Sequence, residues 1–133
     1  MDNVKRVCDF LDETKCYFLA TIDGNKPRVR AFGTNIVCDG KLYIQTGKGK
    51  YVTNQIKNNP NVEICAFNGT KWLRVSAELV NDNNHDVKVA MLEKMPSLKS
   101  SYNPDDDSME MFYLKNATAT FSSFTEAPET FKF

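Results

Sequence analysis

The apolar residues follow two different periods along the chain, and together these predict a mainly β domain with a few inserted helices. Residues with helical spacing make up three short segments, of which the first is expected to have Asp2 or Asn3 at its N-cap and the last Asp82. The expected helices cover residues 3–14, 52–57 and 83–94, with one further helical turn over 97–101.

Stretches rich in β-branched and aromatic residues, or with apolar and polar residues in alternation, predict the strands. The expected strands are residues 16–22, 29–37, 42–46, 62–67, 72–80, 109–114 and 117–124, with 129–133 as an edge strand. Turn residues at Asp23-Gly24 and Asp39-Gly40 predict that the first three strands form an antiparallel meander. Consecutive strands with hairpin turns indicate a closed or nearly closed antiparallel barrel of six to seven strands.

Length and composition limit the class of protein. The 133 residues are 41% hydrophobic and 26% charged, which fits one compact domain over residues 1–133 and excludes a disordered chain. Apolar runs are only a few residues long, so we expect no membrane span and no membrane partner. Because the N-terminus lacks the apolar core of a signal peptide, the chain is expected to be cytoplasmic.

The net charge is zero, which gives no reason to expect nucleic acid as a partner. The charges are unevenly distributed, however. Between Asp23 and Glu63 there are seven Lys or Arg side chains and one acid, Asp39. Such an excess of positive charge is typical of an anion site. It is also typical of a solvated surface whose charge is offset by acidic residues elsewhere, here residues 105–107, and charge alone favours this second interpretation.

Side chains suited to a phosphate group gather in this basic segment. Arg28 and Arg30 lie two apart on a strand and therefore share one face. The next strand ends in residues 46–50, Thr-Gly-Lys-Gly-Lys, directly before a helix whose N–H groups favour anions. A hydroxyl, an ammonium and a guanidinium are the groups that bind a phosphate monoester. The glycine spacing fits neither a dinucleotide fingerprint nor a P-loop.

Other chemistry finds little support. The four cysteines form no CxxC pair and there is one histidine, so we expect no metal site and no redox pair. Cys16, Cys38 and Cys65 lie in strand-like apolar stretches and are expected to be buried thiols. His85 and the acidic run 105–107 are expected to be solvated. No nucleophilic set can be assembled, so we assign no catalytic residue.

Several segments, in order along the whole chain, carry a resemblance to a known family. They are residues 18–24, 27–32, 40–46, 59–67, 72–76 and 112–120. In these segments the chain resembles the flavin-binding split-barrel proteins related to pyridoxamine 5′-phosphate oxidase, and most of all the small branch that includes nitroimidazole-resistance-type proteins. The resemblance implies a split β-barrel of the FMN-binding type with FMN as cofactor.

The resemblance also implies roles for single residues. Arg30 matches an arginine that binds the FMN phosphate, and the backbone of Ala31-Phe32 matches the segment beside the isoalloxazine ring. Thr46 matches a threonine that bonds the phosphate or the ribityl chain. The oxidase has an Arg-Lys pair in the following loop, where this chain has other residues, so its basic contribution is expected from Lys48 or Lys50.

The chain departs from the family at several positions. Trp72 stands in place of a glutamine that bonds the ring, and is expected either to contact the flavin or to lie in the core or a dimer interface. Asn35 replaces a lysine that helps to bind FMN. The family places its flavin between two subunits, so we expect a homodimer. Tyr43, which faces away from its apolar neighbours, is expected at that interface or in solvent. The substrate-binding Arg-His region of the oxidase has no equivalent, so oxidation of pyridoxamine phosphate is not expected.

We therefore expect an FMN-dependent oxidoreductase that reduces a small organic acceptor, for example a nitro compound or a quinone. The cofactor would carry the chemistry, and the protein would supply position and electrostatics. Two alternatives remain: a flavin-binding or redox-sensing protein without turnover, and a related barrel that binds haem or a deazaflavin. Haem would need an axial ligand, for which His85 is poorly placed.

Overall fold

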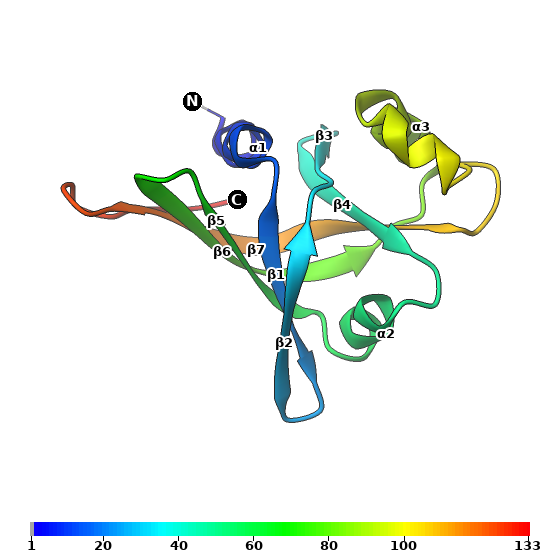
Figure 1. Cartoon of the computed structure of the whole chain (residues 1–133), viewed down its shortest axis with the longest axis horizontal. Helices are drawn as coiled ribbons and strands as arrows, with labels where there is room; N and C mark the ends of the chain where they lie inside the picture. The colour runs from blue at the N-terminus through cyan, green and yellow to red at the C-terminus, as the bar shows by residue number, and fades with distance from the viewer. Residues whose placement is uncertain (1) are drawn as a thin grey trace.

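A computed structural model describes residues 2–133, which form an eight-stranded antiparallel sheet with three α-helices and one 3₁₀-helix (Figure 1). Met1, the first residue of the expected domain, lies outside the described residues. The helices are α1 (Asn3–Thr14), α2 (Tyr51–Asn58), α3 (His85–Lys94) and the 3₁₀-helix η1 (Pro96–Ser100). The strands are β1 (Tyr17–Asp23), β2 (Lys26–Phe32), β3 (Ile36–Cys38), β4 (Lys41–Gly47), β5 (Asn61–Phe67), β6 (Lys71–Asn81), β7 (Met109–Ser123) and β8 (Glu129–Lys132).

The sheet curls into a split barrel, which confirms the predicted fold class. Its strands follow the order β2-β1-β5-β6-β7-β4-β3, and β8 pairs with β7. The two ends of this path, β2 and β3, are not paired with each other within residues 2–133, so the barrel stays open beside β2. Helix α2 contacts both β1 and β4 (Figure 1).

Alternating residues build the barrel core, as the sequence pattern predicted. On β6, Leu73 and Val75 are fully buried, whereas Arg74 and Ser76 are exposed on the outer face. Helix α1 adds its apolar stripe to this core and begins as predicted, with Asp2 Oδ1 accepting hydrogen bonds from two backbone N–H groups of the first turn.

The predicted meander is wrong, because the strand expected over 29–37 is two separate strands. β2 pairs with β1, and β3 pairs with β4. Between them the hydroxyl of Thr34 donates to the carbonyl of Gln45 at 3.1 Å and accepts from the Gln45 N–H at 3.0 Å. The Tyr17 hydroxyl donates to the Thr34 carbonyl at 2.6 Å. These bonds fix residues 33–35 as a link between the two strands rather than as part of either.

Two further expectations need correction. The strands predicted over 109–114 and 117–124 are one strand, β7, because Asn116 adopts a left-handed conformation (φ 52°) that lets pairing continue on both sides. The N-cap of helix α3 is Asn84 rather than Asp82, so the helix begins at His85. The Asn84 side chain accepts from two N–H groups of the first turn, whereas Asp82 accepts from the Tyr43 hydroxyl at 2.8 Å.

Some burial predictions are also wrong. Tyr43 is 3% exposed, because α3 covers the outer side of β4 and packs Val87, Met91 and Leu92 around it; it lies neither in solvent nor on a free surface. Cys16 and Cys65 are exposed and Cys38 is half-buried, while Cys8 is buried. The thiols of Cys16 and Cys65 are therefore not core side chains.

Candidate functional site

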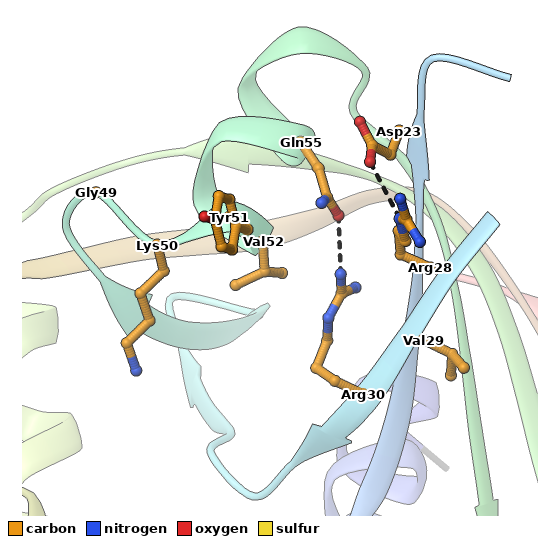
Figure 2. A pocket seen from close by; sticks show the side chains of 9 residues that line it. All are labelled: Asp23, Arg28, Val29, Arg30, Gly49, Lys50, Tyr51, Val52 and Gln55. Carbon is orange, nitrogen blue, oxygen red and sulfur yellow. Dashed lines mark hydrogen bonds and ion pairs between the residues drawn. The ribbon is translucent and has the colours of Figure 1, made fainter. Parts of the chain in front are cut away.

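Arg30 projects inward from β2 to the open side of the barrel. It lies opposite Leu19 on β1, and directly opposed residues point to the same face of a sheet. Its guanidinium donates to the Leu19 carbonyl at 3.1 Å, to the Thr21 hydroxyl at 2.7 Å and to Gln55 Oε1 at 2.8 Å. Figure 2 shows Arg30 reaching from β2 towards Gln55 on α2. Neutral groups thus fix the orientation of this cation.

No carboxylate of residues 2–133 forms an ion pair with Arg30. Burial, and to a smaller extent the positive charge of Arg28, lower the pKa of the Arg30 guanidinium. Arg28 itself pairs with Asp23 at 3.0 Å. A half-buried cation without an anionic partner is chemically suited to an anion from solution.

The start of α2 adds a second positive element to the site. Lys50 is the N-cap residue of α2, and no side chain caps the first turn of the helix. Gly49 has a positive φ of 76°, which allows the tight approach of the loop to the helix. Lys50, like Arg30, has no ion-pair partner among residues 2–133 and lies beside the groove in Figure 2. The uncapped first turn of α2 and the Lys50 side chain therefore both lie beside this groove.

Two cavities meet at these residues. One, of about 680 Å³, lies between the β1–β2 hairpin and α2 and includes Arg28, Tyr51 and Gln55 in its lining (Figure 2). The other, of about 310 Å³, follows β2 through residues 31–34 to Thr46. The lining of both includes Arg30, Lys50 and Val52. We call the two cavities together the β2 groove.

The structure brings most of the predicted cofactor residues together in this groove: Arg30, Ala31, Phe32, Thr46 and Lys50. Two others lie elsewhere. Lys48 forms an exposed ion pair with Asp107 and does not line the groove. Trp72 lies on the outer face of the barrel, between Phe67 and Phe124, whose ring centroids are 6.5 and 5.1 Å away.

Asn35 is absent from the groove lining and is 2% exposed. Its side chain accepts from the Cys8 thiol at 2.9 Å and donates to Asp12 at 3.0 Å. His85 is exposed, with its Nε2 2.7 Å from Asp105 Oδ1. In the described part of the chain no three His, Cys, Asp or Glu residues are arranged to hold a metal ion, and no helix is long and apolar enough to cross a membrane.

Three residues at the site were not predicted from the sequence: Thr21 behind the groove, and Gln55 and Tyr102 in its lining. Thr21 and Gln55 hold the Arg30 guanidinium, and their hydroxyl and amide groups also bond each other at 2.6 Å. Tyr102 lines the groove from the segment after η1. The buried polar position of Thr21 on an otherwise apolar strand face was the one available signal; Gln55 and Tyr102 carried none.

Comparisons with known proteins identify the family of the chain. The profile of the pyridoxamine 5′-phosphate oxidase family matches residues 4–122, and the chain therefore belongs to this family. A NimC/NimA family protein from Clostridium acetobutylicum is 39% identical in sequence, with a TM-score of 0.94 over 98% of this chain and 92% of that one. No curated protein sequence matches the chain.

Two more distant structures share the fold alone. A pyridoxamine 5′-phosphate oxidase-related, FMN-binding protein from Nostoc punctiforme is 14% identical, with a TM-score of 0.62 over 97% of this chain and 95% of that one. A haem-binding protein from Mycobacterium smegmatis is 10% identical, with a TM-score of 0.75 over 98% of this chain and 57% of that one.

Proposed function

We propose that the chain is an FMN-dependent oxidoreductase that reduces a small organic acceptor, such as a nitro compound or a quinone. The observation that carries this proposal is Arg30: a half-buried guanidinium held by neutral groups, without a carboxylate, beside Lys50 and the uncapped start of α2. This set suits the dianionic phosphate of FMN. The family of the chain and the FMN-binding neighbour add support.

Each residue has a stated task in this proposal. Arg30 and Lys50 bind the phosphate, with Thr46 as a further hydrogen-bond donor at the end of β4. The backbone of Ala31-Phe32 lies beside the ring. Lys48 is the weaker candidate for phosphate binding, because it would have to leave Asp107 to reach the groove. The groove residues fit FMN because two cations, Arg30 and Lys50, and the hydroxyl donor of Thr46 line the part of the groove where the phosphate would lie.

The FMN ring, when bound and already reduced, would supply a hydride or electrons to the acceptor and become oxidised. The tasks of the chain are to hold the phosphate, to orient the ring along β2 and to limit access of water. We assign no catalytic side chain, since the residues that line the groove offer no unpaired carboxylate, imidazole or thiol.

We also propose that two copies of the chain form the working unit, with the cofactor between them. The outer face of β1, β2 and β5 carries apolar side chains that one chain leaves in water: Phe18 is 50% exposed, Val29 68% and Phe67 53%. Phe18 lies opposite Ala31, so this face adjoins the groove. A second copy would cover these side chains and close the groove, and Trp72 lies on the same outer face.

The alternatives differ in the groove chemistry they need. Haem iron requires an axial ligand, and His85, the single histidine, is exposed, bonds to Asp105 and lies outside the groove lining. A deazaflavin or a flavin sensor without turnover would use the same anion site, so these two differ from the proposed enzyme only in the reaction.

Stopped-flow oxidation of the FMN-loaded, pre-reduced protein under nitrogen tests the proposed activity. Reoxidation by a nitroaromatic or a quinone should be faster than that of free reduced FMN at the same concentration. Bound FMN that transfers no faster than free FMN to either acceptor class would support the sensor instead. Failure of FMN to bind would remove the proposal altogether.

A further inference from the structure

Two groove side chains meet over Gly47, the last residue of β4. This glycine is buried, and a Cβ atom built on it would lie 3.0 Å from Lys50 Cε and 3.0 Å from the Tyr102 hydroxyl oxygen. The Lys50 stem therefore lies across the Gly47 backbone, and the end of Tyr102 reaches the same point. A Cβ atom at position 47 would therefore push the ends of both side chains aside by a few tenths of an ångström.

Lys50 needs such a contact to stay in the groove. A lysine has a flexible four-carbon stem, and the ammonium of Lys50 has no carboxylate partner among residues 2–133 to fix it. Its neighbour Lys48 is held instead by Asp107, on the acidic loop. The Lys50 stem packs against Gly47 beside the Tyr102 hydroxyl, and this packing holds Lys50 in the lining of the groove that it shares with Arg30.

Tyr102 is itself fixed by its own segment. Its N–H donates to the Leu98 carbonyl at 2.9 Å, at the end of η1, and its side chain is half-buried. It lines the groove together with Arg30, Thr46 and Lys50, although it lies more than fifty residues from Lys50 in the sequence. The segment that contains α3 and η1 thus places the Tyr102 ring at the anion site.

We propose that Tyr102 is a positioning residue for the phosphate group of the ligand and that it acts through Lys50. Gly47 contributes to the same positioning, because its lack of a side chain leaves space for the Lys50 stem and the Tyr102 hydroxyl. This inference rests on the proposed function only in taking the phosphate to be that of FMN. Loss of the contact frees the Lys50 stem, and ordering one long side chain on binding then weakens phosphate binding by about two- to tenfold.

A double-mutant cycle with two ligands tests this inference. Tyr102→Ala and Lys50→Ala should each weaken FMN binding, and the double variant should bind FMN no more weakly than Lys50→Ala alone. Riboflavin, which lacks the phosphate, should bind all of these variants as it binds the wild type. Additive losses, or an equal loss for riboflavin, would overturn the proposal, because Tyr102 would then act on the ring or on the fold.

Two further variants and one simpler ligand complete the design. Gly47→Ala should reproduce the loss for FMN alone, while Lys99→Ala, from the same segment but outside the groove lining, should bind FMN normally. Inorganic phosphate separates this inference from the flavin proposal: it should raise the melting temperature of the wild type more than that of Tyr102→Ala. Equal shifts in both would refute the role of Tyr102 even if no flavin binds.

Discussion

Replacing Arg30 by alanine is the most informative single change, because the side chain combines three features of the site. It is half-buried, it points to where both cavities meet, and its three hydrogen bonds go to uncharged acceptors. A charge-assisted hydrogen bond in such a setting contributes about 1.5–3 kcal/mol. We therefore expect Arg30→Ala to weaken FMN binding by about 2–3 kcal/mol, which is roughly 30- to 150-fold in Kd.

The loss should appear in binding and not in folding. Thr21 and Gln55 still bond each other at 2.6 Å without the arginine, and water can reach the freed Leu19 carbonyl from the groove. The free energy of unfolding should therefore change by less than about 1 kcal/mol, measured by urea denaturation of the flavin-free protein.

Quenching of flavin fluorescence during titration of the apoprotein with FMN measures the effect directly. Arg28→Ala is the matched control, since Arg28 lies on the same face of β2 but is already neutralised by Asp23. It should change the Kd by less than about threefold. A loss below about threefold for Arg30→Ala would refute the assignment of the anion site.

Three other predictions follow from the same geometry. Lys50→Ala should weaken FMN binding by about 1 kcal/mol, whereas Lys48→Ala should have a smaller effect. A larger loss for Lys48→Ala would show that Lys48, and not Lys50, binds the phosphate. Light scattering at micromolar concentration should give twice the chain mass of 15.1 kDa, and Phe18→Glu should shift the FMN-loaded protein towards the monomer; a wild-type monomer with FMN bound would contradict the dimer. His85→Ala and Cys65→Ser should each change turnover by less than about tenfold at full flavin occupancy, and a thousandfold loss in either would reveal a catalytic side chain.

The sequence was sufficient wherever local pattern decides the structure. The alternation along β6 was predicted correctly, and Asp2 is one of the two residues expected to cap the first helix; both features involve neighbours in the chain. Arg30 was also accessible to sequence reasoning, because a charged residue among strand residues demands an explanation and because the family resemblance pointed to it.

Long-range contacts decided the features that were missed. The break between β2 and β3 depends on bonds from Thr34 to Gln45, and the burial of Tyr43 depends on α3, more than forty residues later. Gln55 and Tyr102 gain their place in the groove only through folding. A polar residue on a short helix and a tyrosine in a loop have no local feature that distinguishes them from solvated side chains.

Titration of the purified wild-type protein with FMN, riboflavin and haemin in parallel, followed by absorbance, tests the central claim most directly. The account predicts saturation at one FMN per chain, binding of riboflavin weaker by at least about tenfold because Arg30 and Lys50 have no phosphate to pair with, and no specific shift of the haem Soret band. Equal affinities for FMN and riboflavin, or a stoichiometric haem complex, would contradict it.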